Sequence, residues 1–326
     1  MTVANTSSFP RLMGDVGGTN ARFAVQEAPG AQPSQVRTYS VAEYANIDGA
    51  MQAYVDQLAG PRPRLGAVGI ANPIVGDFLR MTNSPWAFSI EAVRVALGLE
   101  RLLFVNDFTA LALSLPSLQA EHLRPIGPAR AADAQAAIGL LGPGTGLGVS
   151  GLLHDTAGHL VPLGGEGGHV SLAPANARED RVVAVLRDKF GHASAERALS
   201  GMGLVNLYEA LCTIDGVAAR ALDPAGVTGA ATSGSDARCV EAVEVFFGLL
   251  GSVAGNLALT LGARGGLYIG GGIIPRLGDW IDRSTFRERF VAKGRFRDYL
   301  EAMPTWLIHA ETSPALIGAA NALDQL

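Results

Sequence analysis

The stretch from Leu12 to Val25 places the strongest constraint on this chain. An apolar run, Leu12–Val16, leads into the paired glycines Gly17 and Gly18, and a second apolar run ends at Val25. We expect two strands joined by a tight turn. Glycines lack a Cβ and tolerate positive φ, so several backbone N–H groups can converge there on one anion. A plain hairpin turn accounts for the same stretch, so the anion site and the simple turn both stay open here.

Asp15 stands at the end of the first predicted strand, beside this turn. A carboxylate in that place repels a bare phosphate, so an anion site there implies a divalent cation between the two groups. In the alternative interpretation, Asp15 is a surface residue of an ordinary hairpin.

Length and composition bound the kind of protein. The chain has 326 residues, more than one core ordinarily holds, so two domains are expected. Apolar residues make up 48% and charged residues 17%, which is typical of a compact chain rather than a disordered one. The 41 glycines cluster in turns, which favours tight loops close to a ligand.

Charge and cysteine content limit the partners and the location that are expected for this chain. The net charge is −5 and no Lys/Arg cluster stands out, so nucleic acid is not an expected partner. Cys212 and Cys239 are isolated, which favours inert core thiols and a cytoplasmic location. Met1–Pro10 lacks the pattern of a signal peptide, and no apolar run is long enough to predict a membrane span.

A second candidate site follows the predicted strand 101–107. This strand ends in Asn106 and Asp107 and leads directly into a helix over 108–115. Ligands in open α/β sheets gather beyond the carboxyl ends of strands, where helix N-termini also point. The alternative for Asp107 is a plain N-cap.

Periodicity and breakers predict the remaining elements. We expect strands at 35–39, 65–71, 76–81, 137–141, 149–153, 265–275 and 305–308, and helices at 43–58, 90–97, 177–190, 202–211, 237–261, 286–290 and 314–324. The predicted N-caps are Ser89, Ser313 and Ser194, the last on a short helix that carries Glu196. The polar segment 119–136 is a predicted crossing between domains.

The loop 142–148 repeats the design of the opening stretch, with a strand, a glycine turn and a returning strand. Residues 146–151 match G-x-G-x-x-G, but no helix is predicted to follow, so the dinucleotide fold is excluded. No Gly-Lys-Ser/Thr occurs, which excludes a P-loop.

Two further stretches carry chemistry. Glycines flank Glu166 and precede His169, which suits hydrogen bonds to a small ligand. A structural loop and a zinc site are the alternatives there. Glu196 has an alternative role as a carboxylate favoured by a helix dipole. The glycines at 270–272 follow a buried strand and leave a backbone bare enough to lie against a ring or a phosphate.

In the order of the chain, these stretches closely resemble the bacterial glucokinases of the sugar kinase, Hsp70 and actin superfamily. The matching segments are 14–22, 81–88, 105–110, 142–148, 164–170, 194–201 and 266–275. The resemblance implies a two-domain, actin-like (ribonuclease-H-like) α/β fold with an interdomain cleft. It places residues 1–116 and 311–326 in a smaller domain and residues 117–310 in a larger one.

The resemblance also implies a role for each loop. It assigns ATP and its Mg²⁺ to a phosphate-1 loop, a phosphate-2 loop and an adenosine turn, with Asp15 as the metal anchor. These cofactor-binding residues are Gly14, Asp15, Val16, Gly17, Gly18, Thr19, Asn20, Gly144, Thr145, Gly146, Gly270, Gly271 and Gly272. It assigns the sugar to Asn83, Asn106, Asp107, Gly144, Glu166, His169 and Glu196.

The expected activity is ATP-dependent phosphorylation of D-glucose at its 6-hydroxyl, the first step of glucose catabolism, with Asp107 accepting the proton. A kinase for mannose or glucosamine and a non-catalytic sugar sensor are the alternatives. The few residues before Leu12 leave no room for a helix-turn-helix, which argues against the sensor. Residues 170–174 lack the cysteines of zinc-containing relatives, and Ser171 replaces an acidic residue common in close ones. The resemblance further implies a cytoplasmic homodimer without a membrane partner.

Overall fold

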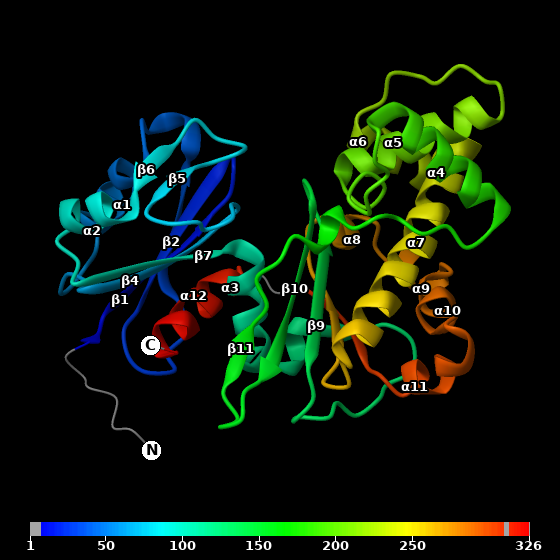
Figure 1. Ribbon diagram of the computed structural model, residues 1–326. Helices are drawn as coiled ribbons and strands as arrows, with labels where there is room; N and C mark the ends of the chain where they lie inside the picture. Colours follow the sequence, from blue (N-terminus) through cyan, green and yellow to red (C-terminus); the bar gives the residue numbers. More distant parts are fainter. Residues whose placement is uncertain (1–7, 310–312, 326) are drawn as a thin grey trace. The chain divides into compact units, whose positions relative to one another are not determined.

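The computed structural model describes residues 8–309 and 313–325, which form two compact units. Unit 1 comprises the described residues up to Gln119 together with those from Ser313 onward, and unit 2 is Ala120–His309. Each unit combines a mixed sheet with helices (Figure 1). Most of the N-terminal stretch Met1–Pro10 lies outside the described residues, and so does the expected domain boundary between residues 310 and 311.

Unit 1 is built on a five-stranded sheet in the order β3-β2-β1-β4-β7, beside a small β5-β6 hairpin. Its strands are β1 (Arg11–Val16), β2 (Asn20–Gln26), β3 (Ser34–Ser40), β4 (Leu65–Ile70), β5 (Phe78–Arg80), β6 (Ala87–Ser89) and β7 (Arg101–Asn106). Its helices are α1 (Ile47–Val55), α2 (Ile90–Ala96), α3 (Asp107–Ser114) and α12 (Pro314–Asp324).

Alternating side chains of β1 serve the two faces of this sheet. Leu12 and Val16 pack in a cluster with residues of α1 and α2, whereas Met13 packs with Ala24, Leu316 and Ala320 on the side of α12. The strands β1, β4 and β7 run parallel, so their carboxyl ends share one edge of the sheet. Both faces of these strands are covered, as is usual for parallel strands.

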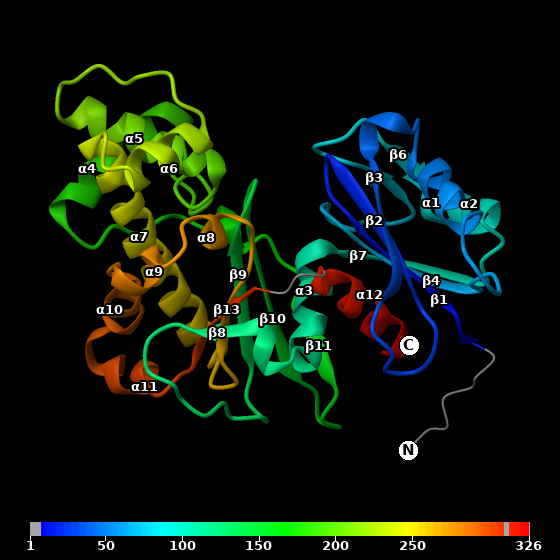
Figure 2. The ribbon, with the colours of Figure 1, turned by 180° about the vertical axis from the view of Figure 1, so that it is seen from behind.

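Helix α12 lies beside α3 although about 200 residues separate them in the chain (Figure 2). A Cβ on Gly318 would lie 1.6 Å from the Ala110 carbonyl oxygen, so only glycine permits this close approach. The side-chain amide of Asn321 donates to the Leu113 carbonyl and the Ser117 hydroxyl. The late helix therefore completes the layer that covers one face of the first sheet.

Unit 2 is built on a six-stranded sheet in the order β11-β10-β9-β12-β13-β8. Its strands are β8 (Leu123–Pro125), β9 (Ile138–Pro143), β10 (Leu147–His154), β11 (Leu160–Pro162), β12 (Leu267–Ile269) and β13 (Thr305–Ile308). Its helices are α4 (Ala177–Phe190), α5 (Gly201–Ile214), α6 (Pro224–Thr232), α7 (Ala237–Leu261), α8 (Ile273–Arg276), α9 (Trp280–Arg283), α10 (Phe286–Val291) and α11 (Arg297–Glu301).

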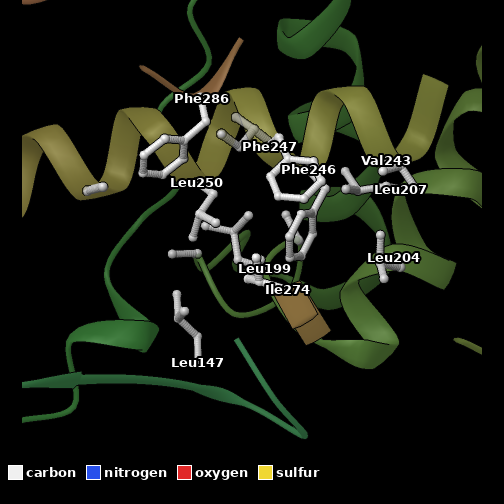
Figure 3. Close-up of a cluster of buried hydrophobic side chains, with 14 of the residues drawn as sticks. Leu147, Leu199, Leu204, Leu207, Val243, Phe246, Phe247, Leu250, Ile274 and Phe286 are labelled. Atoms are coloured by element: carbon white, nitrogen blue, oxygen red, sulfur yellow. The ribbon is translucent and has the colours of Figure 1, made fainter. Parts of the chain in front are cut away.

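Helix α7 forms the centre of the unit 2 core. Figure 3 shows its side chains Val243, Phe246, Phe247 and Leu250 gathered with residues from several other elements, Leu147 of β10 among them. The helix has a mean hydropathy of 1.7 over its most apolar 18 residues, so by length and composition alone it could cross a membrane. That corrects the expectation of no such run, but 72% of the window is buried inside the protein, as in a core helix.

The predicted element types hold for most segments, and the exceptions have local causes. The helix predicted at 43–58 begins only at Ile47, since Asn46 caps it by accepting from the Ile47 N–H. No helix forms at Ser194, which lies in a bridge to Ser171. The segment predicted as a plain crossing contains β8, and the strand predicted at 265–275 is confined to β12, with α8 beginning at Ile273. The elements β6, β11, α6, α9 and α11 were not predicted.

Candidate active site

The opening stretch forms the predicted hairpin, with β1 and β2 antiparallel and the Gly17 N–H donating to the Asn20 carbonyl. The Thr19 carbonyl accepts from Val41 N, which ties the turn to the end of β3. A Cβ on Gly18 would lie 2.6 Å from the Asn83 carbonyl oxygen. The exposed Asn83, in the β5–β6 turn, therefore lies directly against the predicted phosphate-1 loop.

Asp15 and Asn106 lie at the same edge of the unit 1 sheet, as the parallel register requires. Asp15 pairs with Gly69 of β4, and Asn106 pairs with the following residue, Ile70. A Cβ on Gly69 would touch the Ala110 side chain at 3.0 Å and approach the Asp107 Cα to 3.8 Å. Glycine at this position lets the first turn of α3 come close to β4.

Asn106 is the N-cap of α3, which corrects the alternative role considered for Asp107. The Asn106 side-chain oxygen accepts from the N–H groups of Phe108, at 3.0 Å, and Thr109, at 3.2 Å. Asp107 is the first residue of the helix, and its Oδ1 also accepts from Phe108 N. The Asn106 side chain therefore caps α3, and the Asp107 carboxylate lies at the first position of the helix, just beyond the carboxyl end of β7.

Asp15 has two partners that the sequence did not reveal. Its Oδ2 accepts from the Ser313 hydroxyl at 2.7 Å and from Arg22 Nη1 at 3.3 Å. Arg22 is the cross-strand partner of Asp15, so strand register was a usable signal for that contact. Ser313 occupies the N-cap position of α12 as expected, but its side chain caps no N–H of that helix.

The phosphate-2 loop of unit 2 is held by Glu196. The Glu196 Oε2 accepts from Leu147 N at 2.9 Å, and a Cβ on Gly146 would lie 2.4 Å from the same oxygen. The Leu147 side chain is anchored in the core around α7. Glu196 lies in a turn, so the alternative of a carboxylate at a helix N-terminus is wrong, and its carboxylate binds the glycine loop instead.

The segment with Glu166 and His169 packs beside the same loop. Gly168 lies so close to β10 that a Cβ would be 2.1 Å from the Leu147 carbonyl oxygen, and the Glu196 N–H donates to the Gly168 carbonyl. The side chains of Glu166 and His169 are exposed at the two ends of this short 3-10 turn (Gly167–His169). Unit 2 therefore groups three of the predicted sugar residues within one hydrogen-bonded patch.

The predicted adenosine turn, at residues 270–272, packs against the end of β9, the strand that leads into the phosphate-2 loop. Gly270 N donates to the Leu141 carbonyl. Gly271 has a φ of +83°, and a Cβ there would lie 2.3 Å from the Pro143 carbonyl oxygen. Gly144 accepts from the N–H of Gly201 at the start of α5, and the space beside its Cα is open.

The described residues of neither unit form a metal cage. Among residues 8–309 and 313–325, no group of three or more His, Cys, Asp or Glu side chains is placed to hold a metal. Mg²⁺ in phosphate-binding enzymes is typically held by one or two carboxylates together with waters and phosphates, and the single carboxylate of Asp15 fits that pattern. A cavity of about 370 Å³ elsewhere in unit 1, between Phe9 and Pro61, is lined by none of the predicted site residues.

Glycine turns on mixed sheets, with carboxylates beside them, fit the class of actin-like sugar kinases. Solved structures support this class. A glucokinase from an Antarctic psychrotroph is 34% identical, with a TM-score of 0.89 over 97% of this chain and 99% of that one. A ROK family glucokinase from Streptomyces griseus, solved with glucose and AMPPNP, shares the fold at 18% identity, with a TM-score of 0.63 over 97% of this chain and 100% of that one.

Sequence comparison narrows the class. The family model described as glucokinase matches residues 12–326. A glucokinase of Aromatoleum aromaticum is 53% identical over 99% of this chain and 97% of its own length. The chain belongs to the glucokinase family.

Proposed function

We propose that this protein transfers the γ-phosphoryl group of ATP to the 6-hydroxyl of D-glucose. Membership of the glucokinase family supports the reaction, and the observation that carries the assignment of residues is the pair of carboxylates at one edge of the unit 1 sheet. Phosphoryl transfer needs alignment of a hydroxyl with the phosphate and neutralisation of charge, and little covalent chemistry from the protein.

Each unit has its own task in this proposal. Asp107 accepts the proton of the sugar hydroxyl, and the N–H groups of the β1–β2 turn bind phosphate oxygens. Mg²⁺ held beside Asp15 supplies positive charge that offsets the charge on the phosphates. In unit 2, Glu166, His169 and Glu196 bind sugar hydroxyls, and the turns at Gly144 and Gly271 bind the nucleotide.

Selectivity for glucose follows from counting hydrogen bonds. A sugar that lacks or inverts one hydroxyl leaves a polar group of the site unpaired, which costs on the order of 1–3 kcal/mol per group. We therefore expect weaker use of mannose and of glucosamine.

A coupled assay of ADP release over a panel of hexoses tests the function. Turnover that depends on glucose supports the kinase, turnover that favours another hexose reassigns its substrate, and sugar binding without turnover favours the sensor. A homodimer and a cytoplasmic location are also proposed, on the family resemblance and on two cysteines that are free and buried. Light scattering and cell fractionation test these two points.

A further inference from the structure

Ser313 stands where a serine ordinarily caps a helix, yet its hydroxyl is used elsewhere. It precedes Pro314, the first residue of α12, and makes no side-chain bond to the N–H groups of that helix. Serine at an N-cap normally accepts from the second or third N–H of its helix. Here the hydroxyl donates to Asp15 Oδ2 at 2.7 Å, across 298 positions of sequence.

The geometry of strand and helix explains why these two residues meet. Met13 and Asp15 lie on the same face of β1, because side chains alternate along a strand. On α12, Leu316 packs with Met13, and Ser313 precedes Leu316 by three residues, about one helical turn. A helix that places Leu316 over Met13 therefore places Ser313 near Asp15, at the edge of the sheet.

Both hydrogen bonds to Asp15 fall on one oxygen. Ser313 and Arg22 each donate to Oδ2, and the structure gives Oδ1 no partner among residues 8–309 and 313–325. The Asp15 side chain is only 16% exposed, whereas that of Arg22 is 45% exposed and its bond is longer, at 3.3 Å. The serine hydroxyl is thus the shorter and better shielded of the two contacts.

We propose that Ser313 is a positioning residue for Asp15, holding Oδ2 so that Oδ1 is the oxygen left to the cation that accompanies ATP. This inference rests on the proposed function, because it takes Asp15 as the metal anchor. It gives α12 a task beyond packing, since the helix fixes the orientation of a carboxylate on the first strand.

Binding of AMPPNP, measured by calorimetry with Mg²⁺ and again in EDTA, tests the proposal without relying on turnover. We expect Ser313→Ala to weaken binding of the Mg²⁺ complex by about tenfold, the loss typical of one hydrogen bond to a charged group. Binding in EDTA and the KM for glucose should stay unchanged. Ser313→Thr, which keeps the hydroxyl, should restore the preference for the Mg²⁺ complex.

Asn321→Ala is the matched control. It removes two hydrogen bonds of the same helix, one to Leu113 of α3 and one to Ser117 just beyond α3, without touching Asp15. We expect it to lower Tm and to leave the Mg²⁺ preference intact, so an equal loss of preference in Asn321→Ala would reduce Ser313 to a structural role and overturn the proposal.

Asp15→Ala separates the two hypotheses. If Asp15→Ala keeps the Mg²⁺ preference of the unmodified protein, the metal assignment under the proposed function is wrong and the inference about Ser313 is overturned with it. If Asp15→Ala loses the preference while Ser313→Ala keeps it, the metal assignment stands and only the role of Ser313 is overturned. Loss in both, with rescue by Ser313→Thr, supports the proposal.

Discussion

Asp15 and Asp107 share a sheet edge but differ in their immediate partners. Asp15 is held through Oδ2 by a serine from a distant helix, whereas Asp107 follows a residue that has already capped its helix. Because Asn106 satisfies the N–H groups of Phe108 and Thr109, the start of α3 does not depend on the Asp107 side chain for its cap.

Asp107→Asn therefore tests chemistry with little disturbance of structure. We expect kcat to fall by about 10²- to 10⁴-fold, the usual loss when a general base is removed, while the KM for glucose changes little. Steady-state kinetics measures both, and an unchanged Tm serves as the control. A kcat close to that of the unmodified enzyme would refute the assignment of the base.

Gly146→Ala tests the link between Glu196 and the phosphate-2 loop. The new Cβ would lie 2.4 Å from Glu196 Oε2, so the end of this flexible side chain must shift, which weakens its bond to Leu147 N. We expect the free energy of unfolding to fall by up to the roughly 1.5–3 kcal/mol that such a charged hydrogen bond contributes, which lowers Tm. The KM values for glucose and ATP should rise together.

Gly144→Ala is the matched variant for that loop. A Cβ at Gly144 meets nothing within 4 Å, and its φ is not positive, so Tm should be unchanged. A rise in the KM for ATP in this variant indicates contact of the loop with the nucleotide. Equal effects of the two variants on Tm would contradict the proposed link.

For the individual site residues, the sequence predicts which residues matter better than it predicts their hydrogen-bond partners. The glycines and carboxylates stand out because they recur at the ends of several predicted strands. The bonds from Ser313 to Asp15 and from Leu147 N to Glu196 join segments 298 and 49 positions apart, and local patterns carry no signal for such pairs.

Among the elements, α7 and α10 show how glycine sets the distance between helices. A Cβ on Gly251 would lie 2.2 Å from the Phe286 carbonyl oxygen, and one on Gly255 would lie 2.4 Å from that of Phe290. Since both neighbours are backbone atoms, no side-chain rotation relieves the overlap.

Gly251→Ala should accordingly separate the two helices. We expect a loss of about 1–3 kcal/mol in the free energy of unfolding, the usual cost of overpacking, measured by urea denaturation. Gly229→Ala in α6 is the control, because a Cβ there meets nothing within 4 Å and alanine favours a helix. A free energy of unfolding for Gly251→Ala that is no lower than that of Gly229→Ala would show that α7 and α10 can adjust freely.

Glu179 and Arg289 join α4 to α10 through a buried ion pair. Arg289 donates two hydrogen bonds to the Glu179 carboxylate, at 2.6 and 2.9 Å. The Arg289 side chain is 14% exposed and that of Glu179 is 4% exposed. Burial raises the pKa of Glu179, but the bonds from Arg289, Ala175 N and Asn176 outweigh it, so the pKa lies below its usual value.

This shift predicts a dependence of stability on pH. A carboxyl whose pKa is lowered by folding stabilises the protein above its unfolded pKa, about 4.3, and this contribution is lost as pH falls through the folded value. We expect Glu179→Gln to flatten the fall in the free energy of unfolding below about pH 4.5. Arg94 also lowers the pKa of Glu91 on α2, but this pair is exposed and screened by solvent, so Glu91→Gln should change that slope much less.

Across the whole molecule, alternation and breakers predicted most strands and the long helices, and α4, α7 and α12 have the predicted bounds. The short edge strands β6, β8 and β11 were missed, because three residues give too little periodicity and tertiary pairing decides their state. The assignment of α12 to the first unit came from the resemblance, since no local pattern links a helix at 314–324 to strands at 11–70.

Deletion of α12 tests how far unit 1 depends on it. The helix covers Met13 and Ala24 in one cluster and Ala67 in another. We expect hydrogen exchange in β1, β2 and β4 to speed up in the truncated protein and kinase activity to be lost. Peptides of unit 2 are the internal control, and protection of β1 equal to that in the full chain would contradict this dependence.

The late position of α12 in the chain also determines when unit 1 can finish folding during synthesis on the ribosome. The strands of unit 1 emerge first, but the helix that covers one of their faces follows only after Ala120–His309 has been translated. At 5–20 residues per second that delay is roughly 10–40 s. During this interval the apolar face around Met13 and Ala67 is exposed in the nascent chain, so nascent unit 1 is a candidate client for chaperones. Asp15 acquires its serine partner only after Ala120–His309 has been synthesised.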